Sequence, residues 1–69
     1  MEISNHELKI IEDRLNDILR KADVIFHDTM ILLRRKHDEE DERLIKEIRS
    51  NILDIQSIVF VLRDLLGLE

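Results

Sequence analysis

Hydrophobic residues recur at spacings of three and four along most of this chain, which is the pattern of an amphipathic helix. A row of positions at seven-residue intervals widens this stripe in the second half of the chain. We therefore expect a helix over residues 39–66 whose apolar surface is too wide for one neighbouring helix to cover. The stripe consists of Ile45, Ile48, Ile52, Ile55, Val59, Leu62 and Leu66, and the added row of Leu44, Asn51, Ile58 and Leu65.

The first half of the chain carries a similar stripe. Ser4 followed by Glu7 forms a capping-box sequence, which predicts a helix that begins at Asn5 and runs to about residue 36. Further apolar residues join the stripe from Leu19 onward, so this helix also offers surface to more than one neighbour. The stripe consists of Leu8, Ile11, Leu15, Ile18, Ala22, Ile25, Thr29 and Leu32.

The segment between the two stripes, residues 34–43, is entirely polar but contains neither glycine nor proline. One continuous helix is therefore an alternative. The bases of this segment precede its acids, which suits the end of one helix followed by the start of another. The heptad register also shifts across the segment. These features favour a turn at about residues 37–38, with Asp38 as the N-cap of the second helix and Gly67 closing its far end.

The expected fold class is all-α, a single domain over residues 1–69 formed by a two-helix antiparallel hairpin. A chain of this length without cysteine rarely buries enough core alone, so we expect copies to assemble into a homo-oligomeric helical bundle. Dimers are the commonest oligomers and would give four helices. About four apolar positions per heptad exceed the roughly three that a core-facing helix needs, which slightly favours a homotrimer of six helices over a homodimer.

The second helix is expected to supply the oligomer core. A polar residue within such a core can fix register and oligomer state, because wrong pairings leave it buried without a hydrogen bond. Thr29 and Asn51 are the favoured polar specificity residues; Gln56 and Ser57 are further candidates, for which we favour exposure to water. The expected oligomer core consists of Ile45, Ile48, Ile52, Ile55, Ile58, Val59, Leu62, Leu65 and Leu66.

Composition narrows the class of protein. The chain is 43% hydrophobic and 39% charged, which favours charged helices over disorder, and its net charge of −5 argues against nucleic-acid binding. Charged residues interrupt every apolar run, so no membrane span is expected, and no signal peptide is visible. We expect a cytoplasmic or recombinant soluble protein whose partner is itself, with no small-molecule substrate.

Candidate chemistry is sparse. His27 follows Asp23 by four residues and His37 precedes Asp41 by four, but two ligands do not make a metal site. No serine, threonine or histidine spacing predicts a nucleophile with its base. We therefore expect no metal, no cofactor and no enzymatic activity.

Two resemblances bear on function. The capping box, the absence of proline and cysteine, Gly67, and sparse polar residues among branched apolar ones resemble de novo designed helical hairpins. Such hairpins form homo-oligomers around buried hydrogen-bond networks, which implies a structural, self-assembling role.

The alternative resemblance is carried by a short motif. The sequence from Asn5 to Lys9, Asn-His-Glu-Leu-Lys, is similar to the H-box of histidine-kinase dimerisation and phosphotransfer domains. Those domains are also helical hairpins that dimerise into four-helix bundles. By this resemblance, His6 would accept a phosphoryl group and Glu7 would act as the base.

Overall fold

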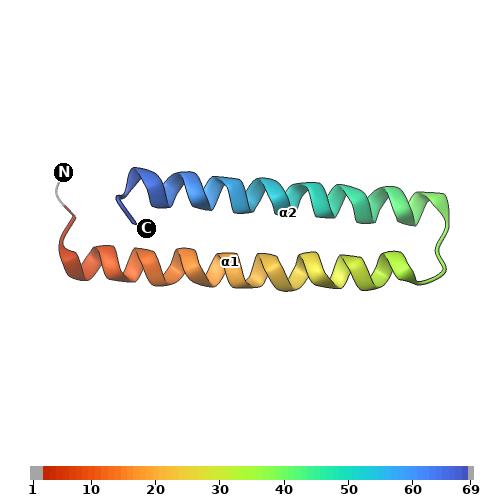
Figure 1. Cartoon of the computed structure of the whole chain (residues 1–69), viewed down its shortest axis with the longest axis horizontal. Helices are drawn as coiled ribbons and strands as arrows, with labels where there is room; N and C mark the ends of the chain where they lie inside the picture. Colours follow the sequence, from red (N-terminus) through yellow and green to blue (C-terminus); the bar gives the residue numbers. More distant parts are fainter. Residues whose placement is uncertain (1–2, 69) are drawn as a thin grey trace.

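The computed structural model describes residues 3–68 and contains two long helices that lie side by side and run antiparallel (Figure 1). Helix α1 spans Asn5–Arg34 and helix α2 spans Glu39–Leu65. The first turn of α1 and the last turn of α2 lie at the same end, opposite the connecting turn. The prediction of an all-α antiparallel hairpin is confirmed, and the alternative of one continuous helix is wrong.

The capping residue of α1 is Ser4. Its Oγ accepts a hydrogen bond from the backbone N–H of Glu7 at 3.1 Å and donates one to the Glu7 carboxylate at 3.0 Å. In a capping box the Glu7 carboxylate would accept from the backbone N–H of Ser4, whereas here it accepts from the serine hydroxyl. At the other end, Arg35 is extended with ψ at 157°, so α1 stops two residues before the expected position. Its N–H bonds to the carbonyl of Leu32 at 3.2 Å, which tightens the last turn.

The ends of α2 follow the sequence closely. The Asp38 carboxylate accepts from the backbone N–H of Asp41 at 2.8 Å, which confirms Asp38 as the N-cap. At the far end, Gly67 has φ of +75°, and the N–H of Leu68 reaches the carbonyl of Arg63 at 2.8 Å. This is the glycine-terminated closure that the sequence predicted, although α2 itself ends at Leu65, one residue earlier than expected.

The hairpin buries one narrow row of side chains from each helix, at seven-residue intervals. These side chains are at most 9% exposed and pack between the two helices. So small a core fits a chain of this length and leaves most apolar side chains only partly covered. Over residues 3–68, neither helix is apolar enough to cross a membrane. The buried residues are Leu15, Ala22 and Thr29 of α1, and Ile45, Ile52 and Val59 of α2.

Candidate interaction surface

The buried rows divide the hairpin into two faces. A residue three positions after a buried residue lies about 60° to one side of it on the helix, and a residue four positions after lies about 40° to the other side. In an antiparallel pair, the corresponding flanks of the two helices fall on the same side. The residues that line the grooves between the helices agree with this: Ile18 and Ile25 share one groove with Ile55, whereas Phe26 shares another with Arg49.

The first face, the aliphatic face, is formed by residues three positions after the buried rows and by Ile11. Apart from Ile11, which is more covered, these side chains are 39–44% exposed. The central groove of this face has one charged lining residue, Lys21. Leu44, Ile58 and Leu65 continue the apolar surface around α2 and are 46%, 58% and 78% exposed. The aliphatic face consists of Ile11, Ile18, Ile25, Leu32, Ile48, Ile55 and Leu62.

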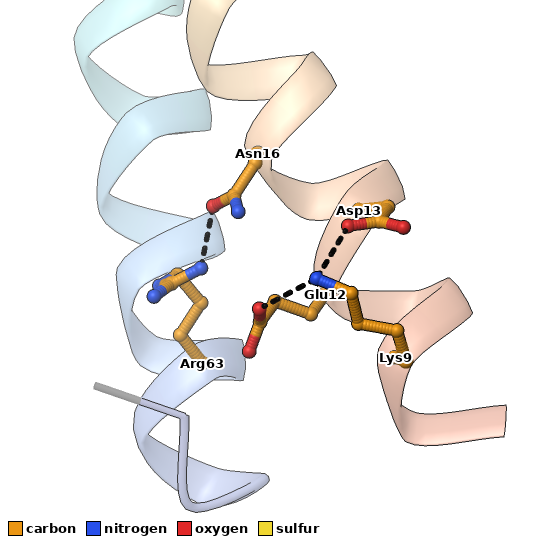
Figure 2. Close-up of polar contacts among 5 residues, drawn as sticks. All are labelled: Lys9, Glu12, Asp13, Asn16 and Arg63. Carbon is orange, nitrogen blue, oxygen red and sulfur yellow. Dashed lines mark hydrogen bonds and ion pairs between the residues drawn. The ribbon is translucent and has the colours of Figure 1, made fainter. Parts of the chain in front are cut away.

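The opposite face is crossed by polar contacts between the helices. The guanidinium group of Arg49 lies 4.2 Å from the ring centroid of Phe26 and donates to the Oγ1 of Thr29 at 3.2 Å. Near the open end, Arg63 donates to the Oδ1 of Asn16 at 2.6 Å (Figure 2). These contacts pair Arg49 with Thr29, and Arg63 with Asn16, within one chain.

The expected polar specificity residues fall in different environments. Thr29 is 3% exposed, and its hydroxyl donates to the carbonyl of Phe26 at 2.6 Å while accepting from Arg49. Gln56 is half-buried, whereas Asn51 and Ser57 are exposed. Asn51 lies between Leu44 and Ile58 in the row that extends the aliphatic face, so a second chain packed there would cover it.

The nine residues of the expected oligomer core fall into two groups, one covered by α1 and one exposed. Ile45, Ile52 and Val59 are buried against α1, and Leu66 is half-buried. They belong to the core of the hairpin itself. The remaining five are exposed and face away from α1 or lie on the flank of the contact: Ile48, Ile55, Ile58, Leu62 and Leu65.

Sequence reasoning did not identify Arg49, Arg63 and Asn16 as contact residues. A signal for the two arginines is present, since Arg49, Gln56 and Arg63 follow the buried residues of α2 by four positions. Their side chains could therefore reach α1 on the flank opposite Ile48 and Ile55. Asn16 has no comparable signal, because its role depends on where Arg63 ends.

Exposed ion pairs lie on the outer surface of both helices. The hydrogen bond from the Lys21 ammonium, 2.9 Å away, lowers the pKa of Asp17 below its usual value. The ammonium of Lys9 lies 3.2 Å from Asp13 and 3.6 Å from Glu12 (Figure 2), and the bond to Asp13 is the main reason that the pKa of Lys9 is raised. Pairs this exposed add little stability.

The histidines are not gathered into a site. His6 and His27 are exposed, and the carboxylate of Glu7 accepts the hydroxyl of Ser4. The ring Nδ1 of His37 lies 2.6 Å from the carbonyl oxygen of Arg35, so this nitrogen carries the proton and donates. Across residues 3–68, no three His, Asp or Glu side chains lie close enough together to hold a metal ion.

The fold and its surface define an antiparallel helical hairpin with one aliphatic face and an opposite face on which polar contacts lie among apolar side chains such as Leu53 and Phe60. No protein-family model, curated protein or solved structure matches the sequence. Function is therefore inferred from the chain's own surface.

Proposed function

We propose that this protein is a structural module that self-associates through its aliphatic face into a homo-oligomeric helical bundle, without catalysing a reaction. The observation that carries the proposal is the continuity of this face. Partly exposed isoleucine and leucine side chains line both helices from Ile11 to Leu32 and from Leu44 to Leu65. Contiguous apolar surface on this scale is typical of an interaction site.

A second copy of the chain is the partner that fits this face best. The face runs along a hairpin 51 Å long, and another hairpin offers the same length and the same spacing of side chains. Completing the burial of one half-exposed isoleucine or leucine contributes about 1 kcal/mol. Several such side chains on each copy can offset an association cost of about 4–15 kcal/mol.

The surface around α2 favours three copies over two. Leu44, Ile58 and Leu65 carry the apolar surface beyond the aliphatic face and onto the outer side of α2. A flat pairing of two hairpins would cover the aliphatic face but leave much of this extension in water. With three copies, the α2 helices form the inner layer and cover it, and Asn51 then lies in the shared interior.

Sedimentation equilibrium at micromolar concentration tests the proposal. The expected result is a species of three times the 8.3 kDa chain mass. Twice the chain mass would retain self-association but reject the trimer. A folded monomer would overturn the proposed function.

A matched pair of substitutions locates the interface. Ile55→Asp places a charge in the aliphatic face, where Ile55 is 39% exposed, and we expect it to convert the oligomer into monomers. Leu53→Asp is the control, because Leu53 is 50% exposed but lies on the other flank of α2. Sedimentation of both variants should show dissociation only for Ile55→Asp. Equal effects would reject the aliphatic face as the interface.

The alternative function, histidine-kinase-like phosphotransfer, is supported by the exposure of His6. A phosphoryl donor could reach that ring, but Glu7 is engaged by Ser4 at 3.0 Å and would have to leave it to act as a base. Incubation with radiolabelled phosphorylated response-regulator domains tests this function. Label that appears on the chain and is lost in His6→Ala would support it; absence of label would reject it.

A further inference from the structure

Two apolar rows of α2 are suited to the contact with α1, and the hairpin uses one of them. The row at the centre of the contact is at most 9% exposed and consists of Ile45, Ile52 and Val59. Turning α2 about its own axis by about 60° would replace this row with the one three positions later. That second row is 39–44% exposed and consists of Ile48, Ile55 and Leu62. We refer to the two arrangements as the observed and the alternative rotation of α2.

Apolar burial by itself favours the alternative rotation. In the observed rotation, the α2 residues on one flank of the contact are polar: Glu42, Arg49, Gln56 and Arg63. The alternative rotation would put the present central row in their place. On the other flank it would bring in a row that is now exposed, namely Leu44, Asn51, Ile58 and Leu65. Because three of these four are large and apolar, the alternative rotation would cover surface that the hairpin leaves in water.

The polar contacts between the helices belong to the observed rotation. The guanidinium group of Arg49 donates to the Oγ1 of Thr29 at 3.2 Å and lies 4.2 Å from the ring centroid of Phe26. Arg63 donates to the Oδ1 of Asn16 at 2.6 Å (Figure 2). In this rotation both arginines lie about 40° from the direction of α1. The alternative rotation would move them to about 100°, which turns both side chains away from α1 and breaks these contacts.

We infer that Arg49 and Arg63 are positioning residues that set the rotation of α2 on α1. Their contacts are directional and form at one angle between the helices, whereas either apolar row can pack on α1. This inference concerns a single chain and holds whether or not copies associate. On the basis of the proposed self-association, the same contacts also keep Ile48, Ile55 and Leu62 on the outside, where a second copy can cover them.

Engineered cysteine pairs report the rotation, because the chain has no cysteine of its own. Leu19→Cys with Gln56→Cys is the pair for the observed rotation. These two half-buried positions lie one heptad from Phe26 and Arg49, which are in contact, and so face each other on the same flank. Ile18→Cys with Ile58→Cys is the pair for the alternative rotation, which would move position 58 from the outer side of α2 toward α1.

The yield of each disulfide within one chain is the measurement. A disulfide within the chain keeps the 8.3 kDa chain mass, which separates it from a cross-link between copies. In the parent background, only the first pair should oxidise in this way, since disulfide geometry demands closely placed Cβ atoms.

Replacement of the two arginines should change this pattern. Arg49→Met with Arg63→Met removes both charges and their donors but keeps unbranched side chains. We expect the ratio of the two yields to shift by about tenfold toward the second pair, because two hydrogen bonds and a cation–π contact no longer oppose it. Arg20→Met with Arg43→Met is the control and should leave the ratio unchanged, since both of these arginines are exposed on the outer sides of the helices.

An unchanged ratio in the double variant would overturn the inference. If the double variant loses its helical circular dichroism, Arg49→Met alone provides the test, because the bond from Arg63 to Asn16 remains. It should show a smaller shift in the same direction, and no shift would again overturn the inference. Sedimentation separates this result from the proposed function: a monomeric parent with the expected cross-links would overturn self-association and support the role of the arginines.

Discussion

Thr29 and Asn51 are polar residues in apolar rows, but the hairpin buries one and exposes the other. The sequence presents them alike, since each interrupts a heptad row of hydrophobic side chains. In the hairpin, Thr29 is 3% exposed and its hydroxyl bonds to Phe26 and Arg49 of the same chain. Asn51 is exposed. Thr29 is therefore satisfied without assembly, whereas the amide of Asn51 would meet a partner only between copies.

The substitution Asn51→Leu should keep the helical fold but loosen control of the oligomer state. A leucine there continues the row of Leu44 and Ile58 and removes the requirement for a hydrogen-bonded layer. Sedimentation velocity should then show a mixture of assemblies. Ser57→Leu, which adds the same side chain away from the aliphatic face, should keep a single species. A single unchanged mass for Asn51→Leu would argue that Asn51 does not specify the assembly.

At the scale of elements, the helix caps were the most predictable feature, because capping depends on a few adjacent residues. The prediction of Asp38 as N-cap was confirmed, and Gly67 adopts the left-handed conformation expected of it. The exact end of α1 was not predictable. Arginine and lysine are common in helices, so the sequence gives no reason for α1 to stop before Arg35 or Lys36. The extended conformation of Arg35 lets the chain turn toward α2.

Removing the cap of α2 should destabilise the hairpin. Asp38→Ala leaves the N–H of Asp41 without its 2.8 Å partner, and we expect a loss of about 1 kcal/mol in the free energy of unfolding. Chemical denaturation followed by circular dichroism measures this. Asp38→Asn preserves the acceptor and should retain most of the stability. An Asp38→Ala variant as stable as the parent would mean that water or another side chain replaces the cap.

At the scale of the whole molecule, the hairpin leaves most of its large apolar side chains partly exposed. The buried residues form a single layer between two helices, while large side chains such as Ile58 and Leu65 are 58% and 78% exposed. Covering these side chains would contribute stability that the hairpin alone does not have. Folding and assembly should then be coupled.

Coupling of this kind makes thermal stability depend on protein concentration. The Tm should rise when the concentration is raised a hundredfold, because mass action favours the associated native state. Differential scanning calorimetry across that range provides the measurement. Ile55→Asp should abolish the dependence if it yields a monomer. A parent Tm that stays constant with concentration would contradict coupled folding.

The sequence by itself predicted the two helices and their caps and favoured a turn between them, because these follow from periodicity and from residues close together in the chain. It also predicted that each helix offers apolar surface to more than one neighbour. Only the tertiary structure decided which apolar row is buried inside the hairpin. Ile45, Ile52 and Val59 pack on α1, whereas Ile48, Ile55 and Leu62 stay exposed. The row of Ile45, Ile52 and Val59 and the row of Ile48, Ile55 and Leu62 are equally hydrophobic in sequence. The choice between them depends on the rotation of one helix against the other. That rotation also separates the polar contacts of Arg49 and Arg63 from the face that is left open.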